Sequence, residues 1–292
     1  MSTIWLIYGA NGWIGKQFIE NIKDKNIIIV KGKSRCDTIE LENEIKLNKP
    51  DRVISFIGRT SGPPELDYKG SINTTIDYLE QPGKLYDNIR DNLFSPLYIE
   101  RICHQENIHF TYIGTGCIYY TPPEQNNIYT ENDEPNFFGS SYSIVKGFTD
   151  KYFRNIKSKV LNVRIRMPIS ENKDPKNLIT KLLKYNKICN CGKNSMTVFS
   201  DLLPVLIEEI KNGKIGTIHL VNPEPMLHSE ILDLYKEIVD PTFSYILMDE
   251  QEQNDILLAK RSTCILNSDY MLNKNVPTLR ESLIRIFKNW KI

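Results

Sequence analysis

The sequence predicts an α/β fold built on a doubly wound parallel sheet, followed by a smaller mixed domain. Three observations lead to this prediction. Short runs rich in β-branched residues alternate with longer amphipathic stretches, which is typical of repeated βαβ units. A segment with three glycines directly follows the first run, where such a fold turns from strand to helix. After Pro168 the alternation loosens, and prolines separate shorter elements.

Each predicted strand is a short run rich in large apolar and β-branched residues. These runs occupy residues 4–8, 27–30, 52–57, 110–113, 160–164 and 217–221. Amphipathic stretches between them predict helices, most clearly at residues 16–22, 202–211 and 229–238. Right-handed crossovers would join the strands into one parallel sheet that is covered by helices on both faces. A turn at residues 81–83 lies inside a long crossover and does not mark a domain boundary.

A glycine-rich loop links the first predicted strand to the first predicted helix. Residues 9–15 read GANGWIG, a GxxGxxG motif. Gly9 would make the tight turn, Gly12 would admit a pyrophosphate, and Gly15 would let the helix pack on the sheet. The N-terminus of the helix would then face the phosphates. The alternative is an ordinary glycine turn. The residues that we expect to contact a dinucleotide are Gly9, Asn11, Gly12, Trp13, Ile14 and Gly15.

The second predicted strand ends in a basic segment, at the position that discriminates between nicotinamide cofactors. An acidic residue there binds a ribose hydroxyl, and a basic residue accommodates the 2′-phosphate of NADPH. Residues 31–35 read KGKSR and contain no Asp or Glu. Lys33, Ser34 and Arg35 could bind a phosphate through charge-assisted hydrogen bonds, so NADPH is the expected cofactor. The alternative is a solvated basic turn.

These features predict two domains. Residues 1–166 would form an NADP-binding Rossmann domain, and residues 167–292 would form a smaller substrate-binding domain. The run at residues 217–221 has the character of a buried strand, so elements around residues 215–222 are expected to return to the Rossmann sheet.

Tyr142 and Lys146 form a YxxxK pair within a helical pattern. Residues four apart project from the same face of a helix. A nearby ammonium favours the phenolate, so we expect Lys146 to lower the pKa of Tyr142 and make its hydroxyl a competent acid near neutral pH. Lys146 could also bind the nicotinamide ribose. Taken alone, the motif is more typical of an exposed helical pair, but its position after a GxxGxxG unit reverses this and favours catalysis.

A third candidate segment follows the predicted strand at residues 110–113. The carboxyl ends of parallel strands face the cofactor crevice. Thr115 would offer a hydroxyl to a substrate carbonyl beside Tyr142, and Cys117, two residues later, would point into the same pocket. The alternative for Cys117 is a small buried core residue.

Together these segments resemble the extended short-chain dehydrogenase/reductase superfamily. Longer runs resemble one family within it, the nucleotide-rhamnose synthases, over nearly the whole chain. They are TGCI at 115–118, PNF at 135–137, RIRMPIS at 164–170, NSMT at 194–197 and ESLI at 281–284. The resemblance implies a bifunctional 3,5-epimerase and NADPH-dependent 4-reductase that converts UDP-4-keto-6-deoxy-D-glucose to UDP-L-rhamnose. The chain departs from the family at residues 55–58, SFIG, where an alanine-rich strand end is usual.

The resemblance also implies roles for further residues. Cys117 would transfer protons during epimerisation, as a similar cysteine does in the related GDP-fucose synthases. Those relatives use a histidine as its partner, but residues 174–181 contain none, so Lys181 is the candidate. The alternative is a surface lysine on an amphipathic helix. Asn92 would support the active-site helix. The residues expected along the nicotinamide and the sugar nucleotide are Met167, Pro168, Asn194, Met196, Thr197 and Arg261.

Composition excludes several other classes of protein. The 37 Lys plus Arg balance 36 Asp plus Glu, so a nucleic-acid surface is not expected. No apolar run approaches the length of a membrane span, and the six cysteines and four histidines match no zinc-ligand pattern. We therefore expect a cytoplasmic protein without a metal. The family resemblance adds a homodimer formed by helices near residues 88–107 and 141–155.

Three other functions remain as alternatives. A 4,6-dehydratase of the same superfamily would need an Asp-Glu pair after the threonine, where this chain has Gly116 and Cys117. A second alternative is a reductase of dTDP-linked 4-keto sugars without epimerisation. The third is a non-catalytic regulatory subunit that binds dinucleotide, which the retention of Thr115, Tyr142 and Lys146 opposes.

Overall fold

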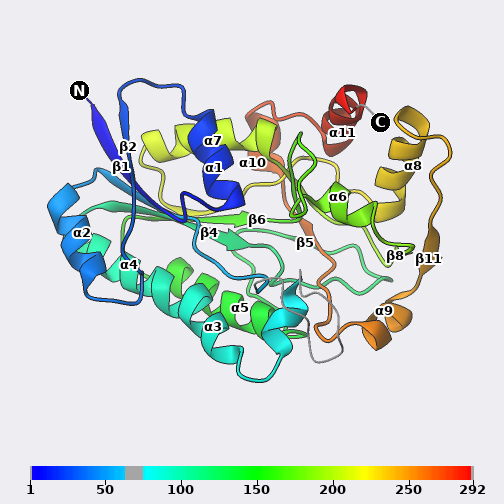
Figure 1. Cartoon of the computed structure of the whole chain (residues 1–292), viewed down its shortest axis with the longest axis horizontal. Helices are drawn as coiled ribbons and strands as arrows, with labels where there is room; N and C mark the ends of the chain where they lie inside the picture. The colour runs from blue at the N-terminus through cyan, green and yellow to red at the C-terminus, as the bar shows by residue number, and fades with distance from the viewer. Residues whose placement is uncertain (1, 63–74, 291–292) are drawn as a thin grey trace.

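The computed structural model describes residues 2–62 and 75–290 of the chain. Its centre is a six-stranded sheet in the order β10, β6, β4, β3, β1, β2 (Figure 1). These strands are β1 (Thr3–Tyr8), β2 (Ile27–Lys31), β3 (Arg52–Ser55), β4 (His109–Thr115), β6 (Val160–Ile165) and β10 (Gly216–His219). Every neighbouring pair is parallel. The predicted doubly wound parallel sheet is therefore confirmed.

Helices cover both faces of this sheet (Figure 1). One face carries α2 (Glu40–Asn48), α3 (Leu85–Ile89), α4 (Ser95–Gln105) and α5 (Ser141–Asn155), and the other carries α1 (Trp13–Asn21), α7 (Phe199–Lys211) and α10 (Asp269–Asn273). Strand β1 shows why both faces are apolar. Trp5 and Ile7 pack into the core beneath α1 and α7, whereas Leu6 and Tyr8 pack into the core beneath α2 and α4. Side chains alternate along a strand, so a central strand must be apolar at every position.

A short 3₁₀ helix, η1 (Ile76–Glu80), and a π-helical turn, η2 (Arg90–Phe94), complete the long crossover from β3 to β4. The predicted turn at residues 81–83 follows η1. Strand β3 is two residues shorter than predicted, because after Ser55 the backbone passes close to the glycine loop. A Cβ on Gly9 would lie 2.9 Å from the carbonyl carbon of Phe56.

The rest of the chain forms a second apolar core beside the sheet. It contains α6 (Leu178–Leu182), α8 (His228–Ile238) and α11 (Leu279–Asn289). Three short parallel pairs lie around it: β7 (Pro168–Ile169) with β9 (Thr197–Val198), β8 (Lys187–Cys189) with β11 (Ile246–Met248), and β5 (Ile128–Tyr129) with β12 (Ile265–Leu266). Helix α9 (Glu250–Ile256) follows β11. Strand β10 and helix α7 leave this region and pack with the main sheet, so the two units interleave in sequence.

Within residues 2–62 and 75–290, no helix combines the length and the apolar character needed to cross a bilayer. The direction of the strands shows at which edge of the sheet a ligand can bind. Strands β1, β3, β4 and β6 run parallel, so their carboxyl ends meet at one edge, and the second core faces that edge.

Candidate active site

A cavity of about 820 Å³ lies where the carboxyl edge of the sheet meets the second core. Most of the residues singled out from the sequence line it, although they come from distant segments. Those lining it are Gly9, Gly12, Trp13, Ile14, Gly15, Thr115, Cys117, Tyr142, Lys146, Met167, Pro168, Lys181, Asn194 and Arg261. One continuous space thus joins the glycine loop to the proposed catalytic groups.

The glycine loop forms a cradle at one end of the cavity. Gly9 has a left-handed backbone with φ of +73° and no room for a side chain beside Phe56. A Cβ on Gly15 would overlap the carbonyl oxygen of Gly9. Because glycine has no side chain at this position, the helix can start close to the loop. Helix α1 begins at Trp13, and no side chain caps its N-terminus. Its first N–H groups can therefore bind an anion, and the loop fits a dinucleotide pyrophosphate.

The structure does not bring every expected cofactor ligand to this cavity. Asn11 is exposed and does not line it, nor do Lys33, Ser34 and Arg35. The exposed guanidinium of Arg35 pairs with Asp37 at 2.8 Å.

A carboxylate is present at the second strand end, although the sequence of residues 31–35 contains none. Glu44, on α2, accepts hydrogen bonds from the backbone N–H groups of Lys33 and Ser34 at 2.8 and 3.0 Å and from the hydroxyl of Tyr8 at 3.0 Å. Residues 31–35 themselves contain no Asp or Glu, as the sequence shows, but the carboxylate of Glu44 from α2 lies beside them. A local motif could not predict Glu44, because this residue lies outside residues 31–35 and reaches them only when α2 packs against the loop.

Tyr142 and Thr115 meet inside the cavity. Tyr142 lies in the first turn of α5, which begins where the Ser140 hydroxyl accepts the backbone N–H of Ser143 at 3.1 Å. Burial raises the pKa of Tyr142 above its ordinary value; negative charge on Cys117 adds to the rise, and a hydrogen bond with Thr115 opposes it. At neutral pH the phenol is therefore protonated and can act as an acid.

Lys146 is buried one turn further along α5. Its Nζ donates to the hydroxyl of Tyr112 at 2.5 Å and to the carbonyl of Ile113 at 3.5 Å. Burial lowers the pKa of Lys146 to about 7, against the opposing influence of Asp150 and Cys117. The predicted lowering of the Tyr142 pKa by Lys146 is contradicted, because desolvation of the phenol dominates and the ammonium is directed at Tyr112.

Asn92 supports α5 from η2, in agreement with the structural role expected for it. Its side chain accepts from the N–H of Arg59 and donates to the carbonyl of the same residue, both at 2.9 Å. Its own carbonyl accepts from the Thr149 hydroxyl on α5 at 2.7 Å. Asn92 therefore ties the active-site helix to the segment that follows β3.

Cys117 is half-buried two residues after the end of β4, and its backbone N–H donates to the Thr115 hydroxyl at 3.1 Å. Arg166, which directly follows β6, donates to the Cys117 sulfur at 3.3 Å. Sequence analysis did not assign a role to Arg166. The available signal was an arginine within the apolar run RIRMPI, next to a predicted cofactor contact.

Met167 follows with a left-handed backbone, φ +41°, and lines the cavity together with Pro168. A non-glycine residue in this conformation is costly and often marks a functional site. Here it turns the chain out of β6 and directs Arg166 inward and Met167 along the cavity wall.

Residues 194–197 (NSMT) mainly form hydrogen bonds within the protein that stabilise the wall of the cavity. The Asn194 side-chain oxygen accepts from Arg166 and from the N–H of Cys264, and its nitrogen donates to Gly192. Met196 and Thr197 are fully buried and do not line the cavity; the Thr197 hydroxyl donates to Leu220. The structure thus gives no support to Met196 and Thr197 as substrate ligands, and Asn194 positions Arg166.

Lys181 and Arg261 lie at the end of the cavity away from the glycine loop. Burial, and secondarily the positive charge of Arg261, lowers the pKa of Lys181 below its ordinary value. Lys181 forms no ion pair within the part of the chain that the structure describes. Arg261 pairs with Asp77 at 2.5 Å and donates to the carbonyl of Ala259 at 2.7 Å. A diphosphate would have to compete with Asp77 for this guanidinium.

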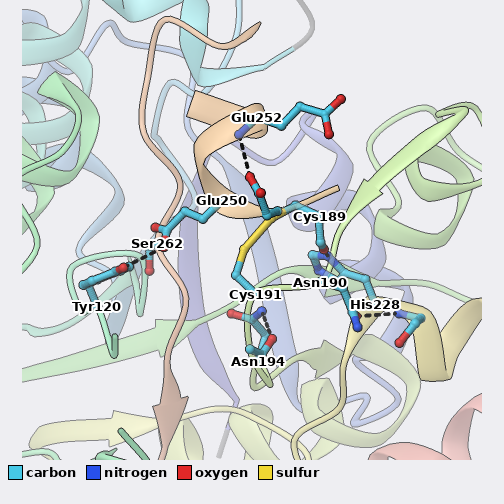
Figure 2. Close-up of a disulfide and its surroundings, with 12 residues drawn as sticks. Tyr120, Cys189, Asn190, Cys191, Asn194, His228, Glu250, Glu252 and Ser262 are labelled. Atoms are coloured by element: carbon cyan, nitrogen blue, oxygen red, sulfur yellow. Dashed lines mark hydrogen bonds between the residues drawn. A yellow bond between two sulfur atoms is a disulfide. The ribbon is translucent and has the colours of Figure 1, made fainter. Parts of the chain in front are cut away.

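A disulfide between Cys189 and Cys191 forms part of the cavity wall (Figure 2). It closes a turn of one intervening residue after β8, with the two Cα atoms 5.9 Å apart. The carbonyl of Cys189 is hydrogen-bonded to Nδ1 of His228 at 3.3 Å, and burial lowers the pKa of His228 to about 4. The sequence analysis missed this bridge, although the two-residue spacing was visible; it considered the cysteines only as candidate zinc ligands.

Comparisons with known proteins give a consistent result. The profile of the NAD dependent epimerase/dehydratase family matches residues 5–205. The chain is 43% identical over 296 residues to protein L780 of Acanthamoeba polyphaga mimivirus, across 98% of both chains. The crystal structure of that protein, described as a UDP-rhamnose synthase, has a TM-score of 0.91 at 42% identity and covers 99% of this chain and 100% of its own.

Two further relatives are more distant. A bifunctional dTDP-4-dehydrorhamnose 3,5-epimerase/dTDP-4-dehydrorhamnose reductase of Arabidopsis thaliana is 31% identical over 289 residues, which is 96% of this chain and 91% of that protein. A dTDP-4-dehydrorhamnose reductase of Bacillus anthracis, solved in complex with NADP, has a TM-score of 0.78 at 17% identity, covers 98% of this chain and 99% of its own, and shares the fold.

Proposed function

The chain belongs to the NAD dependent epimerase/dehydratase family and, within it, to the nucleotide-rhamnose synthases, and we propose that it converts UDP-4-keto-6-deoxy-D-glucose to UDP-L-rhamnose. It would act first as a 3,5-epimerase and then as an NADPH-dependent 4-reductase. The observation that carries the proposal is that Cys117 lies in the same cavity as Thr115 and Tyr142. Reduction alone requires the hydroxyl pair, whereas epimerisation also requires a group that removes protons from carbon.

One site for the ketone oxygen can serve both reactions. Removal of a proton from C3 or C5 leaves an enolate whose charge is on O4, and the hydroxyls of Thr115 and Tyr142 would bind that oxygen. Cys117 would take the proton, and Lys181 would act as the second acid or base. The lowered pKa of Lys181 supports this role, because it increases the neutral fraction of the amine.

In the reductive step Tyr142 would give its proton to O4. Its raised pKa keeps the phenol protonated until that step. Bound NADPH supplies the hydride. The glycine loop and the N-terminus of α1 would hold its pyrophosphate, and Lys146 and Pro168 would lie along its nicotinamide half.

Purified protein should oxidise NADPH only when a nucleotide-linked 4-keto-6-deoxy sugar is present, and the product should be the L-rhamnose nucleotide. The UDP-linked and dTDP-linked sugars should be compared at equal concentration. Preference for the UDP form is favoured by the greater identity to L780 than to the plant dTDP enzyme. A reduced product that retains the D-configuration at C5 would instead indicate a reductase without epimerase activity, and no turnover with either sugar would reject the proposal.

To bind NADPH in preference to NADH, Arg35 must break its ion pair with Asp37 and bind the 2′-phosphate of the cofactor. We expect Arg35→Ala to raise the KM for NADPH by about tenfold or more, the value of one charge-assisted hydrogen bond, and to leave the KM for NADH unchanged. Asp37→Asn is the matched control: it frees the same guanidinium and should not weaken NADPH binding. An equal KM for NADPH in the wild type and in Arg35→Ala would place the 2′-phosphate elsewhere.

We further propose a homodimer that forms through α3, η2 and α5. Leu85, Tyr86, Ile89, Phe94, Phe148 and Tyr152 are large apolar residues exposed on these adjacent helices. A cluster of this kind on a surface marks an interface, and the family resemblance supplies a second copy as the occupant.

Phe148→Glu should convert the dimer to a monomer, because it would place a charge within an apolar contact. Light scattering should show the mass falling to the 33.9 kDa of one chain. Leu272→Glu, at a comparably exposed apolar residue on α10 across the sheet, is the control and should leave the dimer intact. A monomeric wild type, or a dimeric Phe148→Glu variant, would exclude this interface.

A further inference from the structure

The disulfide between Cys189 and Cys191 contributes little to the stability of the whole fold. A disulfide stabilises a protein mainly by restricting the unfolded chain, and this effect grows with the length of the loop that it closes. Here the loop contains one intervening residue, Asn190. Such a small loop restricts the unfolded chain only slightly, so global stability does not account for a bridge at this position.

The bridge is open to small molecules from the cavity. Both cysteines line the cavity, and Cys191 is half-buried whereas Cys189 is buried. A small molecule inside the cavity can therefore reach the sulfur of Cys191, but a folded protein is too large to enter. Exposed disulfides are the labile ones that thiols reduce, whereas buried structural disulfides resist reduction.

The bridged turn holds the N-terminus of α8 (Figure 2). The side-chain oxygen of Asn190 accepts the backbone N–H of Ser229 at 3.3 Å, and the carbonyl of Cys189 accepts from Nδ1 of His228 at 3.3 Å. The first N–H groups of a helix have no partner within the helix, and the N-cap residue here is the apolar Leu227. Asn190, held between the two cysteines, therefore satisfies one of these groups from outside the helix.

The same turn is bound to the cavity wall on its other sides. The N–H of Asn190 donates to the carbonyl of Met248 at 3.4 Å, where β8 pairs with β11. A Cβ on Gly192 would lie 2.9 Å from the side chain of Thr263, so the turn packs closely against that segment. Thr263 is two residues from Arg261, which is expected along the sugar nucleotide. The bridge thus fixes a turn that joins α8, β11 and the chain beside Arg261.

His228 contains an acceptor that has no partner while the bridge is closed. A carbonyl oxygen only accepts, so Nδ1 carries the proton donated to Cys189 and Nε2 is the unprotonated nitrogen. Burial lowers the pKa of His228 to about 4, so the ring is neutral near pH 7. In the part of the chain that the structure describes, Nε2 is buried and forms no hydrogen bond. Reduction creates two S–H donors in the adjoining turn, and a donor to this unpaired acceptor favours the reduced form.

We propose that Cys189 and Cys191 form a site of reversible thiol–disulfide exchange with small thiols, and that reduction of this bridge weakens the binding of the nucleotide sugar. The closed bridge holds the turn, and with it the cavity wall near Arg261. The open form releases the turn. The glycine loop lies at the other end of the cavity, so the affinity for NADPH stays the same. The effect on the sugar nucleotide rests on the proposed function, whereas the exchange itself does not depend on any substrate.

A small dithiol supplies the two electrons for the reduction. One thiolate of the dithiol attacks the sulfur of Cys191, the bond between the two cysteines breaks, and Cys189 leaves as a thiolate that takes a proton. The second thiolate of the dithiol then attacks the mixed disulfide, closes the reductant's own disulfide, and releases Cys191, which takes the second proton. Both protons come from the two thiols of the reductant, and a small disulfide reverses the two steps.

Alkylation of the folded protein tests the exchange without any substrate. Iodoacetamide should leave Cys189 and Cys191 unlabelled in the oxidised protein, and mass spectrometry should find them joined. After dithiothreitol under native conditions both should be labelled, while the buried Cys103 stays unlabelled and shows that the fold is intact. Labelling of both cysteines before reduction would exclude the bridge. Reduction only after unfolding would show that small thiols do not reach it, and either result would overturn the inference.

Hydrogen exchange and ligand binding measure the effect of opening the bridge. Reduction should speed amide exchange in residues 186–194 and in the first turn of α8. It should also weaken the binding of UDP, the probe of the nucleotide end, by about three- to tenfold, the value of one lost hydrogen bond, and leave NADPH binding unchanged. The double variant Cys189→Ser/Cys191→Ser should behave as the reduced protein and not respond to dithiothreitol. Cys103→Ala, at a buried free cysteine that does not line the cavity, is the control and should respond as the wild type does.

Equal amide exchange and equal UDP affinity in the oxidised and reduced protein would overturn the inference. A response to dithiothreitol that persists in the double variant would do the same, because the effect would then come from another thiol. The proposed function is tested separately by the oxidised protein. If reduction speeds amide exchange at the turn but neither form binds UDP, the exchange site stands and the proposed substrate is rejected.

Discussion

Tyr142→Phe is expected to lower the rate of ketone reduction by about 10²- to 10⁴-fold, the usual contribution of a general acid. The variant removes one oxygen and leaves the ring that fills the buried site. The Thr115 hydroxyl keeps its hydrogen bond from the N–H of Cys117, so the fold should be preserved. NADPH oxidation in the presence of the keto sugar gives the rate, and thermal unfolding checks the fold.

The control is Tyr112→Phe, because Tyr112 is a second buried tyrosine close to Lys146. That variant removes a partner of the lysine but not the proposed acid, and its rate should fall far less. If Tyr112→Phe lost reduction while Tyr142→Phe kept it, the roles of the two tyrosines would have to be exchanged. Equal small losses in both variants would mean that neither phenol supplies the proton to O4.

Cys117→Ala is expected to reduce deuterium incorporation from solvent at C3 and C5 to the background rate, again a loss of about 10²- to 10⁴-fold. The physical reason is that alanine cannot carry a proton, while Thr115 and Tyr142 still bind the ketone oxygen. Hydride transfer to C4 should therefore be less affected than exchange. Nuclear magnetic resonance of the sugar after incubation in deuterated buffer measures both carbons.

Two comparison variants show which sulfur and which partner are involved. Cys264→Ala removes a neighbouring buried sulfur that does not line the cavity, and exchange should persist in it. Lys181→Ala should lose exchange at one carbon only, because a second acid or base acts on one of the two centres. Unchanged exchange and product stereochemistry in Cys117→Ala would remove the cysteine from the mechanism, and equal exchange at both carbons in Lys181→Ala would remove the lysine.

The fold and much of the site follow from signals that are local in sequence. Alternating apolar runs predicted all six strands of the main sheet to within two residues at every end. The GxxGxxG loop is recognisable because its glycines are required by contacts within the same strand-turn-helix unit and with the adjacent strand end. Tyr142 and Lys146 were found because one helical turn places them on the same face.

The functional partners of these groups were decided by the tertiary structure. Arg166 meets Ser262 across 96 residues of sequence, and Glu44 reaches back to a loop that contains no acidic residue. The pKa of Tyr142 is set by burial, which depends on every element around it and not on the spacing to Lys146. Periodicity determines which face of an element is apolar, but only the packing of distant elements determines which polar side chains share a buried space and which of them lacks a counter-charge.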